Sequence, residues 1–256
     1  MPDSSTILLV DDEDSIQTLL TYPLERDGYR VIQARDGEEA LRRFREQEVD
    51  LVVLSTHGRS GLGRWVYGSV AEGILHRSPV PVLLVPATAP VSWRTVRQER
   101  YRLLVPLDGS RQAEAALPHA LAIARALAAG LVLLHVVEPR HDYGPDLGLD
   151  AQGEGSVPST LEAEAYLATV AASFDGHELR VRRAVRAGLV AEAILEEARA
   201  DAASLVVMTT HGRTGLGRLP FGSVTTEVLH RCHLPLLLVR PDVGGHGALS
   251  LPTPIE

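Results

Sequence analysis

The sequence predicts two doubly wound α/β domains in tandem, each built on a parallel sheet with helices on both faces. Short apolar segments alternate with amphipathic stretches along most of the 256 residues, which is typical of strand–helix–strand units. A block of 31 residues also occurs twice, because residues 56–86 and 210–240 are identical at 18 positions with an offset of 154. Two long copies indicate paired domains, since a solenoid is built from more and shorter repeats.

The second copy has the fuller pattern, with five expected strands and four expected helices. The strands are expected at 102–107, 131–137, 178–185, 204–209 and 235–240. The helices are expected at 111–129, 160–173, 189–200 and 223–232. Ser110 is placed to cap the first helix, and Ser159 with Glu162 has the spacing of a capping box. Pro118 lies inside the first expected helix and predicts a kink there.

The first copy is shorter and is expected to form only four strands. These strands are expected at 6–10, 29–34, 50–55 and 81–85, with helices at 14–26 and 37–47 before the repeated block. Right-handed crossovers would give the sheet order 2-1-3-4. A unit of 86 residues buries proportionally less surface than a full domain, so we expect it to depend on its neighbour for stability.

Composition excludes several classes of protein. All 25 cationic residues are arginine, and the absence of lysine excludes a Walker A phosphate loop and a Schiff-base enzyme. The formal charge of −8 is concentrated in residues 1–52, which hold 13 acidic residues against 6 arginines. An acidic balance without a basic cluster argues against a nucleic acid as partner.

The expected location is the cytoplasm. Cys232 is the only cysteine, so it cannot form an internal disulfide. The sequence begins MPDSSTILLVDDED, without the basic start and apolar stretch of a secretory signal. No apolar run reaches the roughly 18–20 residues that cross a bilayer, so no membrane association is expected.

Two families are recognisable in these residues. The block THGRTGLGRLPFGSVTTEVLHRCHLPLLLVR, together with SLVVM before it and the earlier LLVPLDGS, resembles the universal stress protein family over residues 101–241. Residues 53–86 resemble the C-terminal part of the same family. Residues 6–52, with the acidic pair Asp11 and Asp12, resemble the first half of a response-regulator receiver domain. Both resemblances imply flavodoxin-like or Rossmann-like sheets, four-stranded in the first unit and five-stranded in the second.

The resemblance divides the chain into four parts. A hybrid domain is expected at 1–86, a linker at 87–100, a complete universal stress protein domain at 101–241 and a disordered tail at 242–256. The strand at 50–55 would lie beside the first strand in both families, so the join keeps the point at which the strand order reverses.

A candidate phosphate-binding loop follows the fourth strand of the second domain. Gly212 is followed after nine residues by Gly222 and Ser223, which is the later part of the family's nucleotide-binding pattern. Glycines let backbone N–H groups approach a phosphate, and the helix that opens at Ser223 adds donors and a positive dipole end. Arg213 is a candidate additional cation.

The resemblance implies that the second domain binds ATP, with Mg²⁺ left open as an additional ion. The implied nucleotide-binding residues are Pro106, Leu107 and Asp108 on the adenosine side, Val136 at the base, and Met208, Thr209, His211, Gly212, Arg213, Gly222, Ser223, Val224 and Thr225 on the phosphate side. Thr209 stands where the family pattern has its first glycine, and its branched side chain could narrow the approach of the ligand. The alternative is that the glycines only shape a turn and that the protein is an interaction or scaffold module.

The first domain has a weaker case for binding a ligand. It keeps Gly58, Gly68 and Ser69, but Ser55 stands where the pattern has its first glycine and where a receiver has its acceptor aspartate. The carboxylates of Asp11 and Asp12 would repel a polyphosphate unless a divalent metal bridged them. We therefore expect neither phosphoryl acceptance nor strong nucleotide binding in this half.

Three histidines and the single cysteine are further candidates for chemistry. His57 and His211 have no metal-ligand companions at i+3 or i+4, so both are expected to be loop histidines with local hydrogen bonds. His135 is expected in the core or at a pocket edge, and Cys232 as a buried, unreactive thiol. No catalytic base is recognisable, so the sequence favours binding over catalysis, with slow ATP hydrolysis left open.

The last strand of each domain would be an unpaired edge if the domain stood alone. Residues 81–85 and 235–239 are apolar, and proteins normally cover such edges. We therefore expect the two strands to pair antiparallel within the chain, which would make the protein an intramolecular pseudo-dimer. A homodimer is the alternative.

Overall fold

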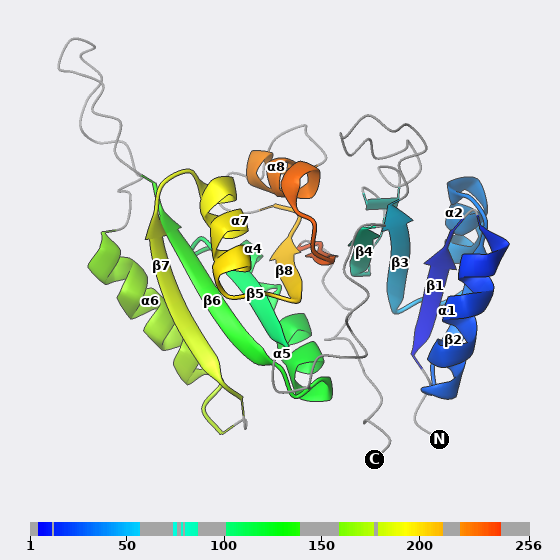
Figure 1. Cartoon of the computed structure of the whole chain (residues 1–256), viewed down its shortest axis with the longest axis horizontal. Helices are drawn as coiled ribbons and strands as arrows, with labels where there is room; N and C mark the ends of the chain where they lie inside the picture. Colours follow the sequence, from blue (N-terminus) through cyan, green and yellow to red (C-terminus); the bar gives the residue numbers. More distant parts are fainter. Residues whose placement is uncertain are drawn as a thin grey trace, which may run out of the picture.

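A computed structural model describes residues 5–11, 13–56, 74–75, 78, 80–86, 101–138, 159–176, 179–211 and 221–241 (Figure 1). The expected linker at 87–100 and the expected tail at 242–256 lie outside the described residues. The described residues form one nine-stranded sheet in the order β2-β1-β3-β4-β9-β8-β5-β6-β7. The expected flavodoxin-like units are therefore fused into a single sheet with helices on both faces.

The first half follows its apolar pattern closely. Its strands are β1 (Thr6–Val10), β2 (Arg30–Ala34), β3 (Leu51–Thr56) and β4 (Val82–Pro86), and its helices are α1 (Asp14–Arg26) and α2 (Gly37–Glu46). These four strands pair in parallel, in the expected order 2-1-3-4. The Asp36 side chain caps α2 by accepting from the Glu39 N–H. The Gln17 amide of α1 is buried and donates to the carbonyls of Asp11 and Ala34, which closes the carboxyl ends of β1 and β2.

The second half alternates strands and helices as expected. Its strands are β5 (Arg102–Leu107), β6 (Gly130–Val137), β7 (Val181–Ala187), β8 (Leu205–Thr209) and β9 (Leu236–Val239). Its helices are α4 (Arg111–Glu114), α5 (Leu117–Ala126), α6 (Thr160–Ala172), α7 (Val190–Ala200) and α8 (Ser223–Arg231). Ser110 caps α4, and Ser159 with Glu162 forms the expected capping box at the start of α6.

Two expected elements differ from the structure. The single kinked helix expected at 111–129 is two helices, because the chain turns at Ala115 and Ala116 and Pro118 lies in the first turn of α5. Proline is tolerated there because the first N–H groups of a helix have no partner within it. The strand expected at 178–185 begins three residues later and ends before Gly188, whose φ of +138° suits glycine.

Strands β4 and β9 join the two halves. They pair antiparallel, with Val82 opposite Leu238, Leu83 opposite Leu237 and Leu84 opposite Leu236. All other strand pairs among the described residues are parallel. The direction of the sheet therefore reverses at the boundary between the halves.

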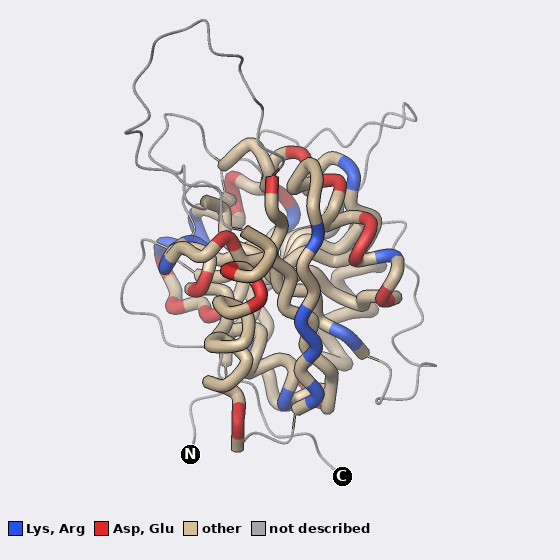
Figure 2. The backbone as a smooth tube through the Cα atoms, turned by 90° about the vertical axis from the view of Figure 1, so that its left-hand side faces the viewer, with Lys and Arg blue, Asp and Glu red and all other residues tan. Residues whose placement is uncertain are grey.

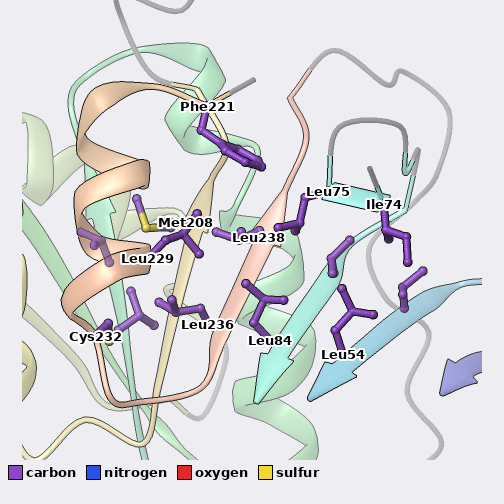
Figure 3. Packing of buried hydrophobic residues seen from close by; sticks show 14 of the residues in the cluster. Leu54, Ile74, Leu75, Leu84, Met208, Phe221, Leu229, Cys232, Leu236 and Leu238 are labelled. Atoms are coloured by element: carbon purple, nitrogen blue, oxygen red, sulfur yellow. The ribbon is translucent and has the colours of Figure 1, made fainter. Parts of the chain in front are cut away.

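One hydrophobic cluster runs under this boundary on the face covered by α2, α7 and α8. It extends from Ile32 of β2 to Ala184 of β7. Figure 3 shows its central part, in which Leu84 of β4 lies with Leu236 and Leu238 of β9. Against the second cluster, under α4, α5 and α6, pack the partly buried Leu51 and Leu83 of the first half. The two halves thus share buried apolar surface on both faces of the sheet.

The outer strand β7 is protected by charge. Its arginines Arg182 and Arg186 pair with Glu197 of α7, whose side chain is only 1% exposed, and Arg182 also pairs with Asp201. Figure 2 looks onto this edge, where basic positions of the strand run between acidic positions of the neighbouring helices. Charged side chains along an edge strand discourage the addition of a foreign strand. In the described part of the chain, no helix has the length and apolar character needed to cross a membrane.

Candidate functional site

The candidate site lies where the strand order reverses in the second half. Strand β5 lies between β8 and β6, with both neighbours parallel to it. The chain leaves the sheet in opposite directions after β5 and β8, because β5 leads into α4 on one face and β8 is followed by α8 on the other. Ligands of such sheets bind at the carboxyl edge of this point, where the loops diverge.

The turn after β5 forms one wall of the site. Asp108 accepts two hydrogen bonds through Oδ1, from the Ser110 N–H at 2.9 Å and from the Ser110 hydroxyl at 2.5 Å. Between them Gly109 has a φ of +81°, a conformation that favours glycine. The sequence LDGS therefore builds a tight turn that ends with the Ser110 cap of α4.

The residues after β8 form the opposite wall. The buried Thr209 hydroxyl donates to the His211 carbonyl at 2.8 Å, and the Thr210 hydroxyl lies 3.1 Å from His211 Nδ1. The Thr210 N–H donates to the Val239 carbonyl, which ties this turn to the end of β9. The Thr209 hydroxyl is thus bound within the turn, and His211 has the local hydrogen bond expected of a loop histidine.

The start of α8 is held against the end of β8. The Gly222 N–H donates to the Thr210 carbonyl at 3.0 Å, and the buried Thr225 hydroxyl donates to the Thr209 carbonyl at 3.1 Å. Gly222 is the N-cap of α8 and provides no side-chain cap, and Ser223 next to it is exposed. The first N–H groups of a helix have no partner within the helix, so they can donate to an acceptor outside it.

Gly222 differs in one respect from its expected role. Its φ is −60°, which any residue can adopt, so the glycine is not needed for a positive φ. A Cβ added here would lie 3.8 Å from the Thr210 carbonyl oxygen, which is an ordinary contact. The backbone therefore accepts a side chain at this position, and any requirement for glycine must come from what approaches it.

The remaining predicted site residues occupy the surrounding strands. Pro106 and Leu107 end β5, and Met208 is buried near the end of β8. Val136 is half-buried on β6 and packs against the cluster beneath α7 and α8, as does Val224 of α8. Eleven of the thirteen predicted residues are thus at or near the carboxyl ends of β5, β6 and β8 or at the start of α8, and Gly212 and Arg213 lie outside the described residues.

Fewer of the candidate site residues of the first half lie in the described part of the chain. Asp12, His57, Gly58, Gly68 and Ser69 lie outside the described residues. Asp11 is buried, and its Oδ1 accepts from the Glu13 N–H at 2.8 Å, at the start of α1. This bond fits the expected structural role of a carboxylate at a helix N-terminus.

The other two candidate residues, His135 and Cys232, are buried, as expected. His135 on β6 is buried, and its ring meets the ring of Tyr166 edge-on. Cys232 is buried after α8, and burial raises the pKa of its thiol. A raised pKa keeps the thiol protonated and unreactive at neutral pH.

Sequence reasoning missed Tyr166 of α6. Its hydroxyl donates to Glu114 Oε1 at 3.0 Å, and burial together with Glu114 raises its pKa. These partners are 52 residues apart in the chain, so no local pattern marks the contact. A tyrosine in an otherwise alanine-rich helix was the only available signal.

A hollow of about 420 Å³ lies at the opposite, amino edge of the same strands. It is lined by Tyr101, Arg102, Ala128, Ala129, Gly130, Leu131, Val132, Arg180, Val181 and Arg182. Arg102 and Arg182 both pair with Asp201 there, so their charge is already balanced within the protein. The strand order and the glycine pattern favour the carboxyl edge as the site.

Comparison with known proteins identifies the family. The model of the universal stress protein family matches residues 8–86 and 100–240. A universal stress protein of Methanocaldococcus jannaschii is 32% identical over 142 residues, which cover 54% of this chain and 81% of that protein. One of Mycolicibacterium smegmatis is 31% identical over 195 residues, which cover 76% of this chain but 63% of that longer protein.

The start of the chain has a second relative. The alkaline phosphatase synthesis transcriptional regulatory protein of Bacillus subtilis is 62% identical over 48 residues. This match covers 19% of the present chain and 20% of the regulator. It agrees with the receiver-like character of the first strands and helices.

Solved structures agree on the fold. A universal stress protein from Archaeoglobus fulgidus aligns with a TM-score of 0.63 at 19% identity, over 89% of this chain and 77% of that one. A protein of unknown function from Pseudomonas aeruginosa aligns with a TM-score of 0.64 at 17% identity, over 94% of both chains. Because the family model accounts for most of both halves, the chain belongs to the universal stress protein family.

Proposed function

We propose that residues 101–241 bind ATP at the carboxyl edge of β5 and β8. Occupancy of this site would change the conformation of the protein or its binding to partners. The observation that carries the proposal is the position of α8, whose Gly222 and Thr225 are hydrogen-bonded to the end of β8. An uncapped helix end is thereby held at the point of strand reversal, where an anion gains both N–H donors and the helix dipole.

Each part of the nucleotide has a matching part of the site. The triphosphate would lie against Gly222, Ser223 and the glycine-rich segment before them. The adenosine would lie between the Asp108 turn and β6, with Val136 toward the base. When bound, ATP would supply a negative charge and a rigid ring system, and this chain's residues would orient both.

We assign no metal site and no catalytic step. Within the described ranges, no group of three or more His, Cys, Asp or Glu side chains is arranged to hold a metal ion. Mg²⁺ would accompany the nucleotide if it takes part at all. The proposed activity is binding, and a cytoplasmic location stays a prediction.

A second candidate is an interaction module that binds no nucleotide. Thr209 favours it, because a side chain stands where the family pattern has its first glycine. The hydrogen bond from its hydroxyl to His211 turns the polar end of that side chain into the loop, which weakens the objection.

Calorimetry with ATP separates the two candidates. The purified full chain is first denatured and any released nucleotide identified by mass, and the nucleotide-free protein is then titrated. We expect ATP to bind the native chain, and Gly222→Val to lower the affinity about tenfold or more by placing methyl groups where phosphates approach. The backbone accepts this substitution, since φ is −60°.

The matched control is Gly68→Val, the equivalent position of the first copy. We expect it to leave ATP affinity unchanged, because the proposed site belongs to the second half. Absence of adenine-nucleotide binding up to millimolar concentration, or equal binding by Gly222→Val, would favour the interaction module instead.

We further propose that the two halves act as an intramolecular pseudo-dimer through β4 and β9. The antiparallel register of these strands supports the proposal. A homodimer of whole chains is the alternative. Sedimentation at micromolar concentration distinguishes them, since the pseudo-dimer requires only a species of 27.6 kDa.

A further inference from the structure

Tyr166 connects three separate segments of the second half. Its ring meets the buried ring of His135 on β6 edge-on, with centroids 5.7 Å apart and planes at 68°. Its hydroxyl donates to Glu114 Oε1 in α4 at 3.0 Å. One side chain of α6 therefore touches a strand and the helix that follows the Asp108 turn.

The helix that Tyr166 contacts begins at the turn that carries Asp108. Ser110, which donates to Asp108 Oδ1, caps α4, and the Glu114 N–H donates to the Ser110 carbonyl at 3.1 Å. The carboxylate that accepts from Tyr166 therefore lies one helical turn from the residue that binds Asp108. Burial and the neighbouring Glu114 raise the pKa of Tyr166, so the hydroxyl keeps its proton and donates to Glu114 at neutral pH.

The strand that Tyr166 contacts is the other wall of the adenosine side. His135 directly precedes Val136 on β6, and it lies opposite Leu107 in the β5–β6 pair. His135 faces α6 with its ring, while Val136 packs toward α7 and α8. The contact with His135 therefore braces β6 from behind, on the face opposite to the proposed ligand.

We propose that Tyr166 is a positioning residue that sets the distance between the Asp108 turn and β6 for the adenosine part of a nucleotide. This inference rests on the proposed function. Tyr166 acts through Glu114 and the start of α4 and does not touch the ligand. The polyphosphate end, which lies against α8, is independent of it.

The variant Tyr166→Phe tests the assignment because it keeps the ring against His135 and removes the hydroxyl hydrogen bond to Glu114. We expect the affinity of the full chain for ATP and for adenosine to fall roughly five- to tenfold. The affinity for inorganic tripolyphosphate, the probe of the α8 end, should stay within about twofold. Tyr22→Phe, on an exposed residue of α1, is the matched control.

Glu114 supplies a second pair of variants. Glu114→Gln keeps a side-chain carbonyl that can accept from the Tyr166 hydroxyl, so ATP affinity should remain close to that of the native chain. Glu114→Ala removes the acceptor and should weaken ATP binding in the direction of Tyr166→Phe. Equal losses of ATP and tripolyphosphate affinity in Tyr166→Phe would overturn the assignment, because they would reflect a general disturbance of the fold.

Hydrogen exchange at the Glu114 amide, which donates to the Ser110 carbonyl, provides a readout that needs no nucleotide. In Tyr166→Phe the first turn of α4 loses its hydrogen bond to α6, so we expect exchange about tenfold faster than in the native chain. Unchanged exchange, with unchanged ATP affinity in a chain that binds ATP, would overturn the role of Tyr166 alone. Faster exchange in a chain that binds no ATP would overturn the proposed function and leave Tyr166 as the residue that holds the turn.

Discussion

Leu83 of β4 lies directly opposite Leu237 of β9 in an antiparallel pair, so the two halves are joined by main-chain hydrogen bonds as well as by side chains. Leu237 is 1% exposed, and its neighbour Leu84 is fully buried. We therefore expect the folding of one half to depend on the other.

Replacement of either leucine by a charged residue should destabilise the whole chain. We expect Leu237→Arg and Leu84→Arg each to lower the free energy of unfolding by about 3 kcal/mol or more, because a charge would be buried without a partner. Urea denaturation followed by circular dichroism measures the change. Leu161→Arg, at a residue 77% exposed on α6, should cost less than about 0.5 kcal/mol. If residues 101–256 alone were as stable as the full chain and monomeric, this dependence would be disproved.

Substitutions of Arg182 and Arg186 on β7 should have strongly non-additive effects on the free energy of unfolding. Glu197 pairs with both Arg182 and Arg186, so removal of one arginine leaves the other in place. Either single alanine variant should cost about 1 kcal/mol or less, whereas the double variant should cost about 3–5 kcal/mol because a buried carboxylate loses its cations. Denaturant midpoints of the four proteins give the coupling energy, and additive costs would refute the network.

Arg183→Ala is the control for that cycle. Arg183 is exposed on the opposite face of β7, since residues 182, 184 and 186 share the face of α7. Its replacement should change stability by less than about 0.5 kcal/mol.

The receiver-like half should not accept a phosphoryl group. The acceptor position at the end of β3 is Ser55, and the chain has no lysine to stabilise an acyl phosphate. Incubation with acetyl phosphate and Mg²⁺ should therefore leave residues 1–60 unmodified by mass spectrometry. Detection of an acid-labile acyl phosphate in residues 1–60 would contradict this prediction.

His119 of α5 should make the protein sensitive to acid. Burial lowers the pKa of this imidazole, so the folded state binds a proton less readily than the unfolded chain. In the unfolded chain the pKa of histidine is about 6.5. Stability should accordingly be complete above that pH and fall as the pH drops below it, by up to about 1.4 kcal/mol per pH unit. His119→Gln should flatten the curve between about pH 7 and pH 5. A change at the exposed His230 should leave its shape intact.

Much of the fold follows from local patterns. Runs such as TILLV and RLLVPL are apolar, short and bounded by polar residues, and the bounds of β1 and β5 agree with them. The break between α4 and α5 was missed because Pro118 suggests a kink, whereas the turn falls just before it. The predicted start of β7 was three residues too early. The arginines of this strand pair with Glu197 of α7, and this contact between distant residues cannot be recognised from the local sequence.

The site was predictable in part for the same reason. Glycine spacing points to Gly222 and Ser223, because a spacing pattern can be recognised along the chain without knowledge of the fold. The role of Tyr166 depends on Glu114 and His135, which come from other elements and meet it only in the folded chain. The φ of Gly222 was equally hidden, since sequence alone does not separate a glycine kept for its backbone from one kept for space.

The junction of β4 and β9 also bears on how the protein responds to dilution. In a dimer of separate chains, an equivalent strand pair comes apart as the concentration falls. Here both strands belong to one polypeptide, so each meets the other at an effective concentration on the order of millimolar, whatever the number of molecules present. A cell could hold very few copies of this protein, and the paired architecture would still be complete in every one of them.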